Sequence, residues 1–290
     1  MHIKITEKPT YNPRVIDFEM IFPDGTPSRY INAIRRVLID TMVPAKYLHV
    51  NPEDMITEDK RVIPEYVAHR IALIPIHQSI PVGTTYSLSV INNHSVPIDV
   101  YAEDLVGPSG YIVSPELEIS TLFRNEYLII NNITVKVKQD HEYAAMAGGY
   151  FAGKDHLTEK MTLAFQTYGT MSPRGMVKRG IDVVLKMLST CRERFSEVKE
   201  TEGGKAKLVL SEMDGTVPEM IFHAVVESFG KDVDITIMDH KDYGDCDITM
   251  NLRNGLTAKY VLEAAVGSIG EFFSDLLRSF DYDPKVDEVI

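Results

Sequence analysis

Two long segments, one in the middle and one near the end of the chain, carry apolar residues at helical spacing. Steps of four and three residues separate the apolar positions in both segments: Val177, Ile181, Val184, Leu188, Cys191 and Phe195 in the first, and Leu262, Val266, Ile269, Phe273, Leu276 and Phe280 in the second. A stripe of this period predicts an amphipathic helix that packs against another helix. Burying six such side chains contributes on the order of 10 kcal/mol before entropy is subtracted, so neither stripe is expected to face water. Ser172 and Thr257 precede the stripes and are expected to cap the two helices.

Shorter patterns predict the elements of the first half. Alternating apolar and polar positions predict strands within residues 3–22. A helix is expected to begin at Pro27 and to end before Pro44, and a second, shorter helix is expected from Pro64. Residues 81–139 are rich in valine, isoleucine and tyrosine, and this composition predicts a β-rich module.

The order of elements in the first half recurs in the second half. A strand at 208–210, an Asp-Gly-Thr turn at 214–216, a helix from Pro218 and a hairpin made by 235–238 and 246–252 lead to the second striped helix. The first half has the same succession, interrupted by the β-rich module. The chain is therefore interpreted as an internal pseudo-repeat.

These patterns predict an α+β fold with two related domains of mixed sheet and long amphipathic helices in one chain, the first carrying an inserted β-rich domain. The expected boundaries are residues 1–52 with 157–200 for the first domain, 53–156 for an inserted β-rich domain, 201–204 for a polar linker, 205–282 for the second, smaller domain and 283–290 for an acidic tail.

Composition and charge narrow the range of functions. The chain of 290 residues has a net charge of −12, which opposes nonspecific wrapping of nucleic acid. It has no apolar run of about 18 residues and no apolar segment typical of a signal peptide at its start, so we expect an intracellular protein that does not enter a membrane. Its two cysteines, Cys191 and Cys246, can form neither a disulfide framework nor a cysteine zinc cluster.

Few patterns in the chain are typical of an active site. The segment from Gly148 to Lys154 nearly matches a phosphate-binding loop, but Asp155 stands where that motif needs a hydroxyl for magnesium. We expect residues 144–155 to form a flexible loop instead. The acidic cluster at 239–247 lacks the ligand order of a calcium loop and is interpreted as a solvated hairpin tip. We therefore expect no catalytic residue, no cofactor and no metal site.

Arg35 and Arg36 lie side by side in the helix expected after Pro27. Neighbouring helical residues point about 100° apart, so both arginines can be solvated only on a well-exposed helix. Apolar residues occupy most of the circumference of this helix. Because guanidinium groups are planar and weakly hydrated, they form good ion pairs between proteins. The pair is interpreted either as a solvated face or as an interaction surface for a carboxylate, a phosphate or a protein.

Several stretches together resemble the signature of one family: Asn32-Ala33-Ile34-Arg35-Arg36, Val43-Pro44-Ala45, Glu65 through His69-Arg70, and Ile74-Pro75-Ile76. The family comprises the α-like assembly subunits of multisubunit DNA-dependent RNA polymerases, namely the bacterial α amino-terminal domain, the archaeal D subunit and the third-largest subunit of eukaryotic polymerase II. The glycine-rich segment after 141–145 and the helix after Ser172 stand where that family has a loop and its dimerisation helix.

The second half is similar to the smaller partner of those subunits, the archaeal L subunit or the eleventh subunit of polymerase II. The similarity covers residues 214–280. Pro218-Glu219 replaces a usual Gly-Asn, and Asp239-His240-Lys241 replaces a usual His-Pro-Leu. A fusion of both halves in one chain is associated with large DNA viruses of eukaryotes.

The resemblance implies a noncatalytic assembly subunit of DNA-directed RNA polymerase, an α-like heterodimer within one chain. The largest and second-largest polymerase subunits would dock on it, with small adaptor subunits nearby, and DNA would be met only through the complex. The residues implied to bind partners are Asn32, Arg35, Arg36, Glu65 and Arg70. The residues implied to form the dimerisation seam are Val177, Ile181, Val184, Leu188, Leu262, Val266, Ile269, Phe273 and Leu276.

Further expectations follow from the same resemblance. No homo-oligomer is expected, because the chain supplies both halves of the dimer. The cysteine-bound cluster that larger members often carry is not expected, because residues 53–156 contain no cysteine. The protein would work in the nucleus or cytoplasm, or in a virion if its source is viral. Two alternatives stay open: a homodimeric interaction scaffold unrelated to transcription, and a nucleotide-binding protein that uses the segment from Gly148 to Lys154.

Overall fold

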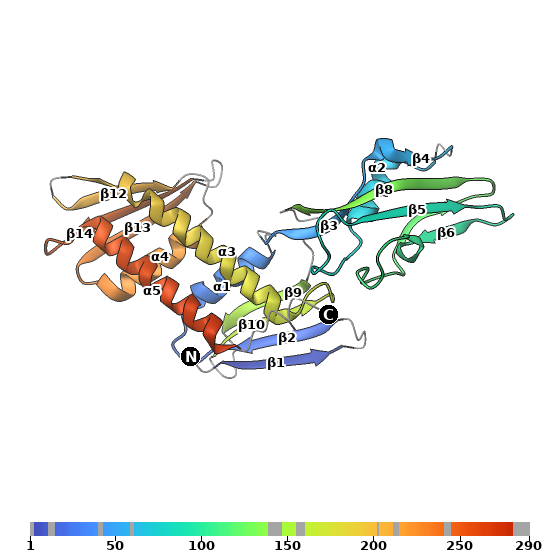
Figure 1. The fold of residues 1–290 in the computed structure, drawn as a ribbon. Coiled ribbons are helices and arrows are strands. Elements are labelled where there is room, and N and C mark those ends of the chain that lie inside the picture. Colours follow the sequence, from blue (N-terminus) through green and yellow to red (C-terminus); the bar gives the residue numbers. More distant parts are fainter. Residues whose placement is uncertain are drawn as a thin grey trace.

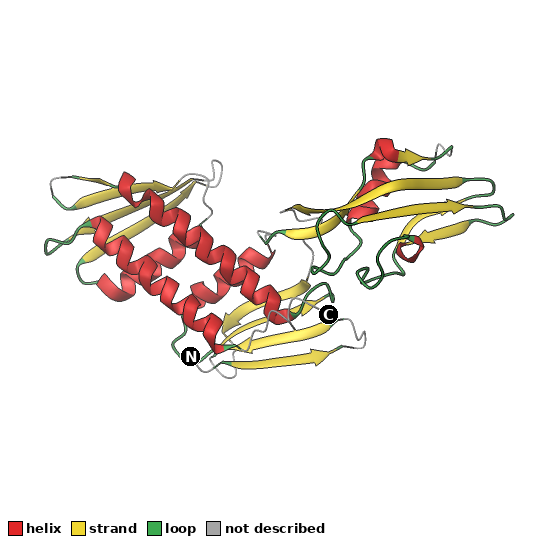
Figure 2. Cartoon of the chain, viewed as in Figure 1, coloured by secondary structure: helices red, strands yellow, loops and turns green. Residues whose placement is uncertain are grey.

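The computed structural model describes residues 3–10, 15–39, 43–58, 61–138, 147–154, 160–201, 203–210, 215–240 and 245–280. Helices and antiparallel sheets both contribute to this part of the chain, so the fold class is α+β (Figure 2). The α-helices are α1 (Ser28–Ile39), α2 (Pro64–Ala72), α3 (Pro173–Glu193), α4 (Thr216–Phe229) and α5 (Ala258–Ser279). Single 3₁₀ turns are η1 (Pro52–Asp54), η2 (Ala102–Asp104) and η3 (Arg194–Glu197).

Two sheets of four strands share one strand order. The first sheet runs β1-β2-β10-β9, with β1 (Lys4–Pro9), β2 (Ile16–Ile21), β10 (Met161–Thr167) and β9 (Ala147–Lys154). The second runs β11-β12-β14-β13, with β11 (Lys199–Glu200), β12 (Lys205–Leu210), β14 (Asp245–Leu252) and β13 (Val233–His240). All neighbouring pairs are antiparallel. Along the chain, α1 and α4 each follow the second strand of their sheet, and α3 and α5 each follow the fourth strand, β10 and β14. The two halves therefore repeat one unit.

A separate module of strands and one helix interrupts the first unit. Its strands are β3 (Ala45–His49), β4 (Met55–Ile56), β5 (Thr85–Ile91), β6 (Ile98–Tyr101), β7 (Glu118–Leu122) and β8 (Tyr127–Lys138). β8 pairs with β3, β4 and β5, while β6 pairs with β7. This module has its own apolar core, which includes Leu48, Ile71, Leu88 and Ile130. Figure 1 shows it to one side of the helices.

The sheet pairing moves both predicted boundaries of the inserted domain. β3 was expected in the first domain, but it pairs with β8 of the module, from Ala45 opposite Lys138 to His49 opposite Thr134. β9 was expected in the module, but it pairs with β10 of the first sheet. The flexible loop predicted at 144–155 is therefore wrong for residues 147–154, which form β9. Glycine lowers strand propensity, and the neighbouring strand and α1 override it here.

Four of the helices, α1, α3, α4 and α5, form a central layer between the two four-stranded sheets (Figure 1). One apolar core runs through this layer and joins both halves, from Phe18 and Ile34 in the first to Ile248 and Phe273 in the second. The two predicted caps are confirmed. Ser172 Oγ accepts a hydrogen bond from the Gly175 amide at 3.0 Å, and Thr257 Oγ1 accepts one from the Tyr260 amide at 3.3 Å. Within the described residues, no helix is long and apolar enough to cross a bilayer.

Candidate protein-interaction site

The two striped helices pack against each other in the central layer. α3 and α5 lie side by side (Figure 1). The structure buries all nine residues of the implied seam: Val177, Ile181, Val184, Leu188, Leu262, Val266, Ile269, Phe273 and Leu276. At the rim, Arg192 Nε lies 2.6 Å from Glu263 Oε2 and forms an ion pair between the helices. This helix pair joins the first half of the chain to the second.

The first and second halves also meet through α1, a contact that the sequence patterns do not reveal. Tyr30 is only 4% exposed. Its ring centroid lies 5.0 Å from that of Phe272 and 5.9 Å from that of His223, which it meets edge-on. Burial, with a smaller contribution from the Glu227 carboxylate, raises the pKa of Tyr30 to about 12. This tyrosine therefore stays neutral at physiological pH and acts as an aromatic anchor between α1 and the second half.

The predicted partner-binding residues on α1 lie at the border between core and solvent. Asn32, Arg35 and Arg36 are all half-buried, while Ile31, Ile34 and other apolar residues of the helix point into the core. Arg35 Nε donates a 2.8 Å hydrogen bond to Asn32 Oδ1, one turn earlier. This bond fixes the direction of the Arg35 guanidinium. In the described part of the chain, no carboxylate lies close enough to pair with Arg35. The remaining donors of Arg35 are therefore available to an acidic group of another molecule.

The predicted residues on α2 belong to the inserted module. Glu65 is exposed. Arg70 Nη1 donates to Glu118 Oε1 at 3.1 Å, and its guanidinium carbon lies 4.9 Å from the centroid of the Tyr66 ring. Burial alone would lower the pKa of Arg70, but hydrogen bonds to Tyr66 and Glu118 raise it overall, so the side chain stays charged. Arg70 thus has an evident role inside the module, where it ties α2 to β7.

The structure does not bring the two predicted sets together. Asn32, Arg35 and Arg36 lie on the central helix layer, whereas Glu65 and Arg70 lie on the module (Figure 1). Beside Arg70, a groove of about 280 Å³ runs between α2 and β7. It is lined by Arg61, Val62, Ile63, Tyr66, Val67, Arg70, Glu118, Ile119, Ser120, Thr121 and Phe123. Any partner that contacts all of the predicted residues must span the junction between layer and module.

That junction is held by Gln78, which sequence reasoning did not single out. Gln78 Oε1 accepts from the Lys46 amide at 2.8 Å, and Lys46 Nζ donates to the Gln78 carbonyl at 2.7 Å. The Gln78 amide donates to the Thr170 carbonyl at 2.8 Å, which lies just before α3. Gln78 is only 3% exposed. The bonds to Lys46 lie within the module, and the bond to Thr170 links the module to the segment before α3, so the buried Gln78 fixes the orientation of the module relative to the helix layer.

Next to Gln78 lies a buried histidine whose charge state is constrained. The Ser79 amide donates to His77 Nδ1 at 3.2 Å, so this nitrogen is an acceptor and the neutral ring carries its proton on Nε2. Burial, followed by the positive charges of Lys46 and Arg179, lowers the pKa of His77 below its usual value of 6.5. His77 is therefore neutral at physiological pH and acts as a structural group.

The other sequence candidates do not assemble into a site for chemistry. The segment from Gly148 to Lys154 is an extended strand, whereas a phosphate-binding loop must curl around its anion and lead into a helix. Asp155 lies outside the described residues. So do residues 241–244 of the acidic cluster, while Asp247 of that cluster pairs with Lys207 at 2.7 Å. Among the side chains that the structure describes, no three His, Cys, Asp or Glu residues gather as a metal site would require.

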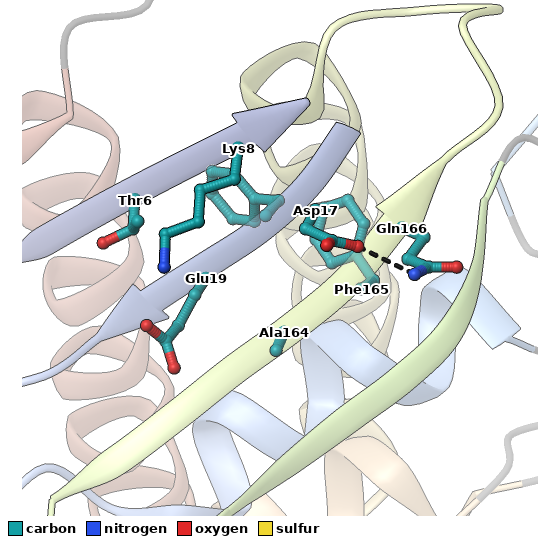
Figure 3. Close-up of a pocket in the computed structure, with 8 residues that line it drawn as sticks. Thr6, Lys8, Asp17, Glu19, Ala164, Phe165 and Gln166 are labelled. Atoms are coloured by element: carbon teal, nitrogen blue, oxygen red, sulfur yellow. Dashed lines mark hydrogen bonds between the residues drawn. The ribbon is translucent and has the colours of Figure 1, made fainter. Parts of the chain in front are cut away.

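A depression with mostly polar side chains lies on the outer face of the first sheet. It has a volume of about 440 Å³ and is lined mainly by Thr6, Lys8, Asp17, Glu19 and Gln166 (Figure 3). Gln166 Nε2 donates to Asp17 Oδ1 at 2.7 Å, and the aromatic rings of the same strands are buried on the opposite, helix-covered side. A shallow polar sheet face lacks the convergent apolar walls typical of a small-molecule site.

No protein-family model matches the sequence, and no curated protein matches it.

Proposed function

We propose that this protein is a noncatalytic assembly platform of a DNA-directed RNA polymerase, with two α-like halves paired inside one chain. The observation that carries the proposal is the repeated unit. The sheets β1-β2-β10-β9 and β11-β12-β14-β13 have equivalent order, and their helices share one core. A dimerising family whose two members are fused would require such an arrangement. The signature around Asn32, Arg35 and Arg36 supplies the link to polymerase.

In this proposal the helix layer gives the platform its rigidity, and its rim binds the partners. The largest and second-largest polymerase subunits would dock on it, with small adaptor subunits nearby. Arg35, held by Asn32, would meet a carboxylate of the second-largest subunit. Glu65 and Arg70 would extend the contact onto the module. DNA and magnesium would be bound by the large subunits and not by this chain.

The geometry favours this proposal over the two alternatives. A homodimeric scaffold would need an unpaired apolar helix face to hold a second copy, but α3 and α5 bury their stripes within one chain. A nucleotide-binding protein would need a phosphate loop, but the segment from Gly148 to Lys154 is a strand.

Charge reversal on α1 tests the proposal. Replacing both arginines, Arg35→Glu with Arg36→Glu, is expected to leave a folded chain, because the apolar side of α1 is unchanged. The same variant is expected to lose co-purification with the catalytic polymerase subunits, because the introduced glutamates would repel the acidic groups of the partner. The matched control is Arg278→Glu, at a side chain that is 79% exposed near the end of α5. Undiminished recovery of both catalytic subunits with the double variant would overturn the assignment of α1.

A further inference from the structure

β13 forms one edge of the second sheet, and its hydrogen-bond register can be worked out from one contact. Val233 lies opposite Leu252 at the end of the ladder, and just beyond this pair the Arg253 amide donates to the Asp232 carbonyl at 2.9 Å. In an antiparallel pair, hydrogen-bonded and non-hydrogen-bonded positions alternate. Asp234 and Thr236 therefore bond to β14, whereas the intervening residues of β13 direct their amide and carbonyl groups away from it.

The residues that face away from β14 are Val233, Ile235 and Ile237. No described residue forms a hydrogen bond with the amide or carbonyl groups of these three. Their side chains lie on the side of the sheet covered by α4, where Val233 and Ile235 belong to the core and Ile237 packs against it (Figure 1). The edge of β13 thus presents regularly spaced backbone donors and acceptors, next to the apolar side chains on the α4 side of the sheet.

The other edges of the two sheets are protected, and β13 is not. β1 carries Lys4, Lys8 and Pro9, which oppose the addition of another strand. β11 is only two residues long. β9 is rich in glycine, and its pairing with β10 contains an irregularity. In contrast, β13 runs for eight residues with regular pairing and without lysine, arginine or proline. Met238 on its outer face is 62% exposed.

We propose that the edge of β13 binds an extended segment of a partner polypeptide, which adds to the second sheet as a fifth strand. The backbone row fixes the conformation of this segment, because only a strand satisfies evenly spaced outward amides and carbonyls. Residues of the incoming strand that point toward α4 would be apolar, to cover Ile235 and Ile237. The sites on the opposite face would be polar, beside Asp234 and Thr236.

Charge argues for a partner and against a second copy of this chain. The chain carries a net charge of −12, so two copies repel each other. Asp234, on the exposed face of the strand, is already paired with Arg253, which follows β14, at 2.6 Å. The acidic surplus of the whole chain, and not this side chain, therefore favours a partner segment with basic residues. The segment that fits is therefore an alternating apolar and polar strand with basic flanks. This inference does not depend on the assignment to RNA polymerase.

Amide hydrogen exchange of the full chain, followed by NMR, tests the proposal. In the free protein the amides of Ile235 and Ile237 are expected to exchange fast, while those of Asp234 and Thr236, bonded to β14, exchange slowly. The probe is a short synthetic peptide in which valine and threonine alternate between terminal lysines. Its addition at saturating concentration is expected to slow the exchange of the Ile235 and Ile237 amides about tenfold or more.

Two variants at one position separate the contribution of the backbone amide to peptide binding from that of the side chain. Ile237→Pro removes an outward amide that takes no part in the ladder, and Ile237→Ala removes a similar amount of side chain but keeps the amide. The proline variant is expected to bind the peptide at least about fivefold more weakly than the alanine variant. Slow exchange of the Thr236 amide shows that each variant is folded. If the proline variant does not fold, Met238→Lys, which places a cation on the exposed face of β13, serves instead and is expected to weaken binding of the lysine-flanked peptide.

Three results would overturn the proposal. In the first, the peptide leaves the exchange of the Ile235 and Ile237 amides unchanged. In the second, these amides become protected with rising protein concentration and no peptide, which would assign the edge to a second copy. In the third, a folded Ile237→Pro variant binds the peptide as tightly as Ile237→Ala does. If Met238→Lys is used instead, the corresponding result is that it binds the peptide as tightly as the unaltered protein.

Discussion

Removing one aromatic ring from α5 should weaken both halves of the protein at once. Phe273 is fully buried, and its ring centroid lies 5.3 Å from that of Phe272 and 6.0 Å from that of Tyr30 on α1. Replacing a buried phenylalanine with alanine costs about 3–5 kcal/mol, from lost transfer energy and the cavity that remains. The Phe273→Ala variant should fall in this range, which is a large share of the total stability of about 5–15 kcal/mol typical of a domain.

The assay is urea unfolding followed by tyrosine fluorescence and circular dichroism. The chain contains 14 tyrosines and no tryptophan, so the fluorescence of tyrosines in both halves is visible. The matched control is Tyr260→Ala, on the same helix but 59% exposed. Its expected cost is below about 1 kcal/mol.

The decisive readout is hydrogen exchange in the first half of the chain. Because α1 and α5 share one core, amides of α1 should lose protection in Phe273→Ala together with those of α5. If α1 keeps its full protection while only the second half is destabilised, the two halves do not form one cooperative unit, and the reasoning is refuted.

Two further predictions follow from buried titratable groups. The neutral His77, near Lys46 and Arg179, should make the protein lose stability as pH falls below about 6.5, because the unfolded chain then binds a proton that the folded chain binds only at lower pH. In the His77→Gln variant, the urea midpoint should depend less on pH between pH 5 and 8 than in the unaltered protein. An unchanged pH dependence of the midpoint would contradict this prediction. Burial, with a smaller contribution from Cys246, raises the pKa of the Cys191 thiol to about 12. Because both cysteines are buried, iodoacetamide should label neither of them before the protein unfolds. Rapid labelling of the folded protein at pH 7 would contradict this prediction.

Elements with a strong period could be predicted from the sequence. The stripes from Val177 and Leu262 gave α3 and α5 and their caps, because a repeat close to 3.5 residues is specific for packed helices. The hairpin of β13 and β14 followed from alternation, and it is longer than predicted. Local pattern is sufficient for such elements, because their side chains face one continuous core.

Pairings between distant residues could not be predicted in this way. β3 pairs with β8 across about ninety positions, and glycine-rich β9 becomes a strand only because β10 and α1 lie beside it. The Thr26 hydroxyl, next to the expected start of α1, donates to the Pro23 carbonyl at 2.7 Å, and the helix begins at Ser28. The aromatic partners of Tyr30 and the ion-pair partner of Arg70, Glu118, lie far away in the sequence. The pairing of β3, the strand β9 and the distant contacts of Tyr30 and Arg70 depend on tertiary contacts, which single-sequence patterns do not contain.

The most direct test of the proposed platform is purification of the tagged chain from its native source, with identification of the proteins that elute with it. The account predicts near-stoichiometric recovery of two large polymerase subunits, and their loss in the double variant Arg35→Glu with Arg36→Glu. Recovery of the chain without any polymerase subunit would contradict it.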